Sequence, residues 1–227
     1  MSKPHGMDEP DRQALLTTLT TEHFTLQGAR GSTIGESGSR ASLYISAVSS
    51  ALIALGFIGQ ASNLGTAFDV FALTVLPTVF VLGVFTFVRL IENSVEDILY
   101  GRAINRIRSY YLRVAGPEAR YFMLSGHDDA HGVLANMGLR PTRWQLYFTT
   151  AAMIGVVNSV VAGTTIALLV AIAADAALGI AAAGGGAVAL ISVALHFRYD
   201  RWRHLQAGGH VEAPLSPSPG AGETRGR

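Results

Sequence analysis

The chain has 227 residues, of which 49% are hydrophobic and only 15% are charged, with no cysteine and a formal net charge of +1. Soluble domains carry about a quarter charged residues, so this composition, with a mean hydropathy of +0.34, is not that of an ordinary soluble domain. The near-zero charge and the missing cysteines argue against basic nucleic-acid binders, disulfide-stapled secreted domains and zinc ribbons.

Four long segments contain no Asp, Glu, Lys or Arg. They are residues 41–68, 70–88, 144–174 and 176–197, with 28, 19, 31 and 22 residues. Each is close to or above the roughly 20 residues that an α-helix needs to cross a bilayer. A 24 kDa chain is too small to bury four wholly apolar helices in a soluble fold. The sequence therefore predicts an all-α polytopic membrane protein, with four transmembrane helices in two hairpins and a small cytoplasmic helical region.

The basic residues predict the orientation in the membrane. All 17 lie before the first span, between the second and third spans, or after the fourth: Lys3, Arg12, Arg30, Arg40; Arg89, Arg102, Arg106, Arg108, Arg113, Arg120, Arg140, Arg143; Arg198, Arg201, Arg203, Arg225, Arg227. Because basic residues favour cytoplasmic loops, we expect both termini and the central segment in the cytoplasm. Sixteen of the 17 are arginine, which is typical of GC-rich bacteria, so the expected location is a bacterial inner (plasma) membrane.

We expect the following segments in chain order: a disordered N-terminus (1–19), a cytoplasmic helix (20–40) leading into the first span (41–60), the second span (68–88), a cytoplasmic helical segment (89–143), the third span (146–172), the fourth span (176–197) and a basic, disordered cytoplasmic tail (198–227). Large aromatic and basic side chains at the cytoplasmic ends of spans favour the headgroup layer. The expected interface anchors are Trp144, Trp202, Arg40, Arg89 and Arg198.

Small residues predict two surfaces for helix packing. Gly28, Gly31, Gly35, Gly38 and Ser42 are spaced 3, 4, 3 and 4 apart, so in a helix they form one face for a partner helix. A flexible Gly/Ser linker is the alternative, because each interior glycine costs a helix about 1 kcal/mol relative to alanine. Gly184 and Gly185 would let the fourth span approach the bundle centre or another protomer closely.

Asn158 is the most polar residue near the middle of a span. In hydrocarbon its amide requires a hydrogen-bond partner, so we expect it to join two helices; a pore or ligand contact is the alternative.

A basic face is expected on the cytoplasmic continuation of the second span. Arg102, Arg106, Arg108 and Arg113 would contact anionic lipid headgroups. An anionic ligand or nucleotide is the alternative partner of the same charges.

The residues from His127 to His131 offer the strongest candidate for chemistry. His127 and His131 are spaced i, i+4, which on a helix suits a transition metal, and Asp128 would add a carboxylate. The alternative is helix capping: Asp128 or Asp129 suits the N-terminus of a short helix that ends at Gly138.

No catalytic constellation, dinucleotide fingerprint or cofactor motif is recognised. We therefore expect a non-enzymatic, self-associating membrane protein with a cytoplasmic interaction or sensing region, no cofactor and no nucleic-acid partner. Its expected partners are the lipid bilayer, further copies of the chain and a cytoplasmic protein. An oligomeric pore or channel for ions or small solutes is one alternative. A membrane-embedded metalloenzyme using His127 and His131 is the other.

Overall fold

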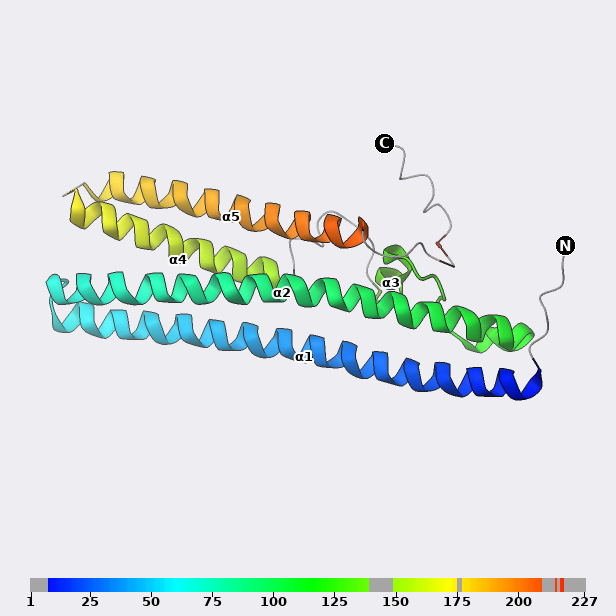
Figure 1. Cartoon of the computed structure of the whole chain (residues 1–227). Coiled ribbons are helices and arrows are strands. Elements are labelled where there is room, and N and C mark those ends of the chain that lie inside the picture. The colour runs from blue at the N-terminus through cyan, green and yellow to red at the C-terminus, as the bar shows by residue number, and fades with distance from the viewer. Residues whose placement is uncertain (1–7, 139–148, 175–176, 210–214, 216, 219–227) are drawn as a thin grey trace, which may run out of the picture. The chain divides into compact units, whose positions relative to one another are not determined.

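The computed structural model describes residues 8–138, 149–174, 177–209, 215, 217 and 218, and every regular element within them is helical. The elements are α1 (Glu9–Ala61), α2 (Thr66–Ala115), the 3-10 helix η1 (Gly116–Tyr121), α3 (Ala130–Asn136), α4 (Thr150–Ala173) and α5 (Leu178–Gly209) (Figure 1). Four of them, α1, α2, α4 and α5, are long and apolar enough to cross a membrane. The expected fold class is confirmed: the chain is an all-α, multi-pass membrane protein.

The helix α1 is longer than the sequence analysis expects. It begins at Glu9 and runs without a break to Ala61, so residues 20–40 are helical and not a flexible linker. The expectation of a disordered N-terminus is wrong for residues 9–19. Two features support helix there: Glu9 and Asp11 lie in the first turn, where a carboxylate meets the positive end of the helix dipole.

A tight turn joins α1 to α2. The amide of Leu64 donates to the carbonyl of Gly59 at 2.9 Å, and the amide of Asn63 donates to the carbonyl of Gln60 at 3.4 Å. Asn63 and Leu64 both have positive φ, 49° and 56°. This is the Schellman pattern that ends many helices, with asparagine at the left-handed position. It returns the chain into α2, which continues through Pro77 to Ala115.

The second pair of long helices is α4 and α5, which pack side by side (Figure 1). Thr149 caps α4, its hydroxyl accepting a hydrogen bond from the amide of Ala152 at 3.1 Å. α5 extends to Gly209, so the expectation of a disordered tail from residue 198 onward is wrong for residues 198–209. The rings of Tyr199 and Trp202 lie 5.8 Å apart in this extension and add an apolar contact to it.

The described chain divides into two compact units, to both of which α1 and α2 contribute. The first unit comprises Met1–Ile34, Glu96–Pro141 and Glu212–Arg227, and the second comprises Gly35–Val95 and Thr142–Val211. All four apolar segments belong to the second unit, together with its core: Ala41, Tyr44, Ala51, Ala72, Leu76, Val79, Phe87, Leu90, Ile91, Ala151, Ile154 and Val161.

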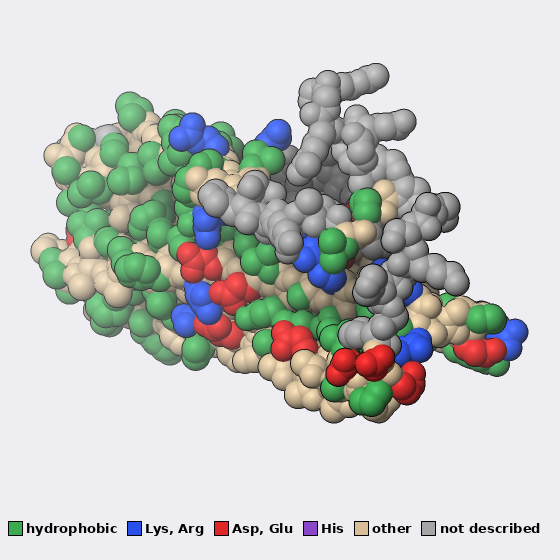
Figure 2. Space-filling view, turned by 45° about the vertical axis from the view of Figure 1, so that its right-hand side comes forward, with side chains coloured by type: hydrophobic (Ala, Val, Ile, Leu, Met, Phe, Trp, Pro, Cys, Tyr) green, Lys and Arg blue, Asp and Glu red, His purple; other side chains and the backbone are tan. Residues whose placement is uncertain are grey.

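The surface of the second unit is apolar where the spans are expected. Leu52, Phe57, Phe85 and Leu190 are each more than 60% exposed, and hydrophobic side chains gather at the left-hand end of the view in Figure 2. Large exposed apolar surfaces of this kind are suited to lipid and not to water.

Candidate functional site

The residues of the expected metal cluster do not share a helical face, because α3 begins only after His127. Asp129 is the N-cap of α3, and its carboxylate accepts a hydrogen bond from the amide of Gly132 at 2.6 Å. His131 lies inside α3 and is exposed. Within the described residues no group of three or more His, Cys, Asp or Glu side chains could hold a metal ion. The capping interpretation of Asp129 is confirmed, and Gly138 follows the helix with a φ of 72°, as a C-terminal glycine does.

Asp128 is fully buried and serves as an ion-pair partner. Its Oδ2 lies 2.8 Å from Nε of Arg106, and its carbonyl oxygen accepts a hydrogen bond from Nε of Arg102 at 2.8 Å. The loop before α3 is fixed further by Asn105, which donates to the carbonyl of His127 at 2.8 Å. Two of the four arginines expected to form a basic face therefore hold this loop against α2.

The C-terminal segment contacts the same loop. The amide and hydroxyl of Ser218 donate to the carboxylate of Asp129 at 2.6 and 2.9 Å, and the amide of Leu215 donates to Asp128 at 3.1 Å. Burial tends to raise the pKa of Asp129, but the hydrogen bonds from Ser218 and Gly132 outweigh it, so its pKa is lowered. The two carboxylates thus join the end of the chain to the start of α3 within the first unit.

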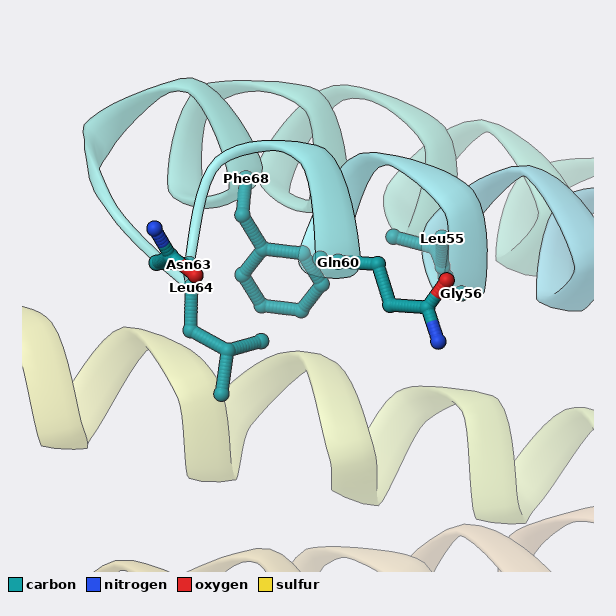
Figure 3. Close-up of a pocket in the computed structure, with 7 residues that line it drawn as sticks. Leu55, Gly56, Gln60, Asn63, Leu64 and Phe68 are labelled. Atoms are coloured by element: carbon teal, nitrogen blue, oxygen red, sulfur yellow. The ribbon is translucent and has the colours of Figure 1, made fainter.

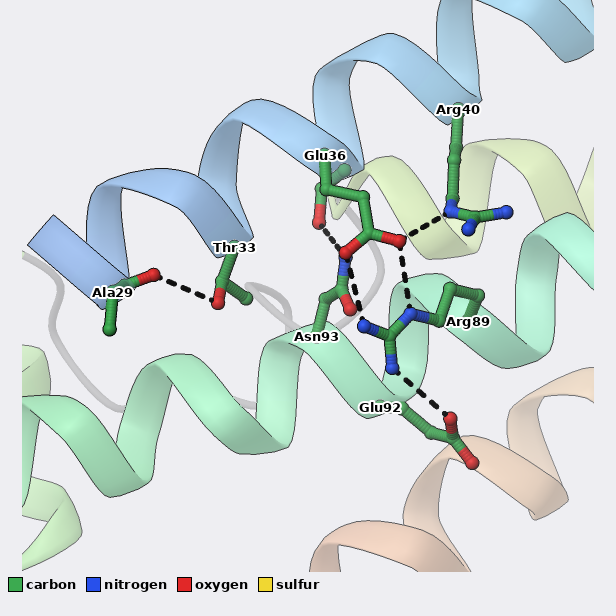
Figure 4. Close-up of polar contacts among 8 residues, drawn as sticks. Ala29, Thr33, Glu36, Arg40, Arg89, Glu92 and Asn93 are labelled. Carbon is green, nitrogen blue, oxygen red and sulfur yellow. Dashed lines mark hydrogen bonds and ion pairs between the residues drawn. The ribbon is translucent and has the colours of Figure 1, made fainter.

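A charged cluster in the second unit joins α1 to α2. Glu36 accepts hydrogen bonds from Arg89 at 3.0 and 3.1 Å and from Arg40 at 2.7 Å, and Glu92 lies 3.6 Å from Arg89 (Figure 4). The hydrogen bonds from Arg89, followed by those from Arg40, lower the pKa of Glu36 to about 2. Arg40 and Arg89, two of the expected interface anchors, are therefore ion-pair partners of Glu36.

The other expected anchors are placed only in part. Trp202 is half exposed and Arg198 is exposed, both on α5. Trp144 lies outside the described residues. The same part of α5 carries an ion pair that the sequence analysis misses, between Nδ1 of His204 and Asp200 at 2.9 Å, with the hydroxyl of Ser94 3.3 Å from the other ring nitrogen. Hydrogen bonding to Asp200 raises the pKa of His204.

Asn158 lies at a contact among three helices. It is fully buried, and its Oδ1 accepts a hydrogen bond from the hydroxyl of Tyr44 in α1 at 3.1 Å. A Cβ added to Gly83 of α2 would overlap the Asn158 amide and lie 2.8 Å from the Tyr44 ring. Among the described residues, the Nδ2 group of Asn158 has no hydrogen-bond partner. Glycine at position 83 is thus what leaves room for this polar pair between apolar helices.

A second polar cluster, which the sequence analysis also misses, joins α4 to α5. The buried hydroxyl of Ser159 lies 3.0 Å from that of Ser192, and Nδ1 of His196 donates to the carbonyl of Ser192 at 2.7 Å. The rings of Phe87 and His196 form a T-shaped pair, with centroids 4.5 Å apart. A cavity of only about 10 Å³ adjoins this cluster, enough for about one water molecule. These contacts stabilise the packing of α4 against α5.

The glycines that were expected to pack fall into two groups. A Cβ on Gly185 would lie 2.5 Å from the carbonyl oxygen of Gly163 in α4, so this glycine is required where α5 meets α4. A Cβ on Gly184 would meet nothing within 4 Å.

The glycine stripe of α1 belongs, like Gly184, to the group without close contacts. It is defined as Gly28, Gly31, Gly35, Gly38 and Ser42. Each glycine of this stripe is exposed and has open space where a Cβ would lie, and Ser42 is exposed too. The opposite face of α1, with Thr33, Ala41 and Tyr44, is buried. No contact within the described chain uses the glycine stripe.

An open hollow of about 660 Å³ lies at the turn between α1 and α2. Leu55, Gly59, Leu64 and Phe68 are among its mostly apolar lining residues (Figure 3). An open apolar hollow of this kind is suited to the apolar chains of lipids.

No protein-family model, curated protein or solved structure matches this chain.

Proposed function

We propose that this chain is a non-enzymatic protein of a bacterial plasma membrane, which associates with copies of itself and carries an interaction or sensing region on the cytoplasmic side. The distribution of basic residues supports the orientation, with both termini and the central segment in the cytoplasm. The membrane bundle would act as an anchor and an assembly surface. The first unit would contact a cytoplasmic partner.

The glycine stripe of α1 carries the proposal for self-association. Glycine costs a helix interior about 1 kcal/mol relative to alanine. At Gly83, which faces Asn158, and at Gly185, which faces Gly163, this cost accompanies a close contact, whereas Gly184 has open space around it. On α1 the same cost meets open space. A second copy of α1 would fill this open space, because small residues let two helix backbones approach closely.

The construction of the first unit supports an interaction or sensing role. Its loop before α3 is held by side chains of α2, namely Arg102, Asn105 and Arg106, and by Ser218 of the C-terminal segment. A folded region of this kind, attached to the ends of membrane helices, can pass a change at its surface to the bundle or to a bound protein. Its role is therefore one of binding, for which no catalytic group is needed.

The oligomeric mass in lipid nanodiscs or mild detergent tests the proposal. We expect the natural chain to be a dimer or larger, and Gly31→Leu to reduce it to a monomer with an unchanged helical content. Ser32→Leu is the matched control, because residue 32 is also exposed but lies about 100° around the helix from residue 31. A natural chain that is strictly monomeric would contradict the proposal.

A further inference from the structure

The arginines of α2 in the first unit differ in their partners. Arg106 pairs with the Asp128 carboxylate, and Arg102 binds the Asp128 carbonyl. Arg108 instead donates from a single nitrogen, Nη1, to the side-chain oxygen of Asn105 at 2.8 Å and to the carbonyl of Ser125 at 3.5 Å. Within the described residues it has no carboxylate partner, and its Nε and Nη2 make no hydrogen bond. Arg108 is half-buried, so its charge is held in place without an opposite charge.

His23 of α1 lies beside this guanidinium. Its ring centroid is 5.9 Å from that of Tyr111, which follows Arg108 by three residues and so lies one helical turn further along the same face of α2. The Nδ1 atom of His23 is buried and has no hydrogen-bond partner in the part of the chain that the structure describes, while Nε2 lies 2.6 Å from the side-chain nitrogen of Gln27. Burial, and then the charge of Arg108, lower the pKa of His23.

A second arginine adds positive charge at the same place. Arg30 follows His23 by seven residues, on the same face of α1, and pairs with Asp97 at 2.7 Å. Burial, and then the nearby charge of Arg30, lower the pKa of Arg108. Within the described residues Arg30 therefore has a carboxylate partner and Arg108 has none, and the imidazole beside Arg108 has a lowered pKa.

The geometry points to a binding site for a phosphate group at Arg108, in which Nε and Nη2 of the guanidinium bind two phosphate oxygens beside the imidazole of His23. The two nitrogens left without partners are those that an arginine uses for paired contacts with phosphate. A bound dianion would supply the missing negative charge and, because it lies near the imidazole, would raise the pKa of His23.

This ligand class deepens the proposed function, because it gives the sensing region a chemical signal. The phosphate group belongs either to a soluble phosphate compound or to a lipid headgroup, and both offer the same oxygens to Arg108. In contrast to Arg108, Arg113 of the same helix is exposed and lies 3.4 Å from the hydroxyl of Ser109 and against the Tyr110 ring. It supplies a matched control.

The test is calorimetric titration of the full chain with inorganic phosphate at constant ionic strength, in nanodiscs of phosphatidylcholine. We expect saturable binding of phosphate. Arg108→Gln should weaken the affinity by about tenfold or more, because charge-assisted hydrogen bonds are lost. Arg113→Gln should change the affinity by less than twofold. Arg108→Lys keeps the charge but loses the paired geometry, so an intermediate affinity is expected. A nitrogen-15 titration of His23 should show its pKa rising when phosphate is added.

Nanodiscs that contain phosphatidylglycerol distinguish the two sources. If a lipid headgroup is the ligand, phosphate binding disappears in these nanodiscs and the His23 pKa is raised without added phosphate. If a soluble compound is the ligand, phosphate binds equally in both kinds of nanodisc. The inference is overturned if neither condition shows binding, or if Arg113→Gln weakens it as much as Arg108→Gln. Such a result leaves self-association untouched, because the oligomeric mass is measured separately.

Discussion

The hydroxyl of Tyr44 donates a hydrogen bond of 3.1 Å to the side-chain oxygen of Asn158, and so joins α1 to α4 inside the apolar bundle. Both residues are fully buried. Gly83 of α2 borders the pair so closely that any side chain there would overlap the Asn158 amide. Three helices thus meet at one polar contact, whose position is set by a glycine.

Gly83→Ala should destabilise the bundle by about 1–3 kcal/mol, the usual cost of overpacking a core, because the new methyl group overlaps the side chain of Asn158. The free energy of unfolding in mixed detergent measures this loss. Shortening the opposing residue in the double variant Gly83→Ala/Asn158→Ala should restore more than half of it. If the two substitutions instead add independently, residues 83 and 158 are not in contact.

Gly185→Leu should lower the thermal stability strongly, whereas Gly184→Leu should leave it nearly unchanged. The difference arises because a side chain at 185 meets the Gly163 carbonyl and, at 2.6 Å, the methyl group of Ala167, while a side chain at 184 meets nothing within 4 Å. Backbone atoms cannot move aside as a flexible side chain can. Thermal unfolding followed by circular dichroism compares the two variants, and equal effects would show that α4 and α5 do not approach each other at Gly185.

The stability should depend on pH through Glu36, which lies just before the first expected span. Its pKa in the folded protein is about 2, below the ordinary value of 4.5, so the folded state favours the ionised carboxylate. The resulting stabilisation is complete above pH 4.5 and is lost as the pH falls from there towards 2. Thermal midpoints of the natural chain and of Glu36→Gln should therefore converge over this range. Convergence at a higher pH would be inconsistent with the ion pairs.

Carboxyl carbon-13 titrations of Glu36 separate the two arginines. Arg89 donates two hydrogen bonds to this carboxylate and Arg40 donates one. We therefore expect Arg89→Gln to raise the pKa of Glu36 further than Arg40→Gln does. This comparison is the control for the pH dependence of stability, because it measures the effect of each arginine on Glu36 directly.

Labelling with a membrane-impermeant maleimide tests the proposed orientation. The chain contains no cysteine, so single cysteines report one position each. Asn63→Cys, at the turn between α1 and α2, should react in intact cells, because this turn carries no basic residue and is proposed to face outward. Glu118→Cys, in the central segment, should react only after permeabilisation. The reverse pattern would show that the orientation is opposite.

The four apolar helices could be predicted because a charge-free, apolar run of about 20 residues is typical of a transmembrane helix. The extent of the helices could not, because α1 from Glu9 and α5 to Gly209 continue through polar sequence. No long apolar run identifies the helix in these parts. Its ends depend on capping and on charges near the helix dipole, which contribute from a few tenths of a kcal/mol to about 1 kcal/mol each. Composition alone therefore assigned these residues to disorder.

The candidate sites were predictable only where local spacing decides the outcome. Asp129 caps α3 because its side chain reaches an amide three residues later, a purely local rule. The same cap places His127 outside the helix, which removes the face that the metal interpretation assumed. The ion pair of Asp128 with Arg106 joins residues 22 positions apart, and no spacing rule indicates it.

The polar cluster of α4 and α5 is not among the predicted sites, although half of it lies within one apolar segment of the sequence. Ser192 and His196 lie four residues apart in an otherwise apolar helix, and a histidine in such a segment is a signal that can be recognised. Its partner Ser159, on another helix, could not be identified without the packing of α4 against α5.

Self-association through the glycine stripe of α1 is tested most directly by disulfide crosslinking in native membranes. Gly35→Cys lies on the stripe, and Ile34→Cys, at an adjacent residue that is also exposed, lies about 100° around the helix. Under mild oxidation we predict that most of the Gly35→Cys chain runs as a covalent dimer, while Ile34→Cys remains monomeric. A monomeric Gly35→Cys chain, or equal crosslinking at both positions, would contradict the account.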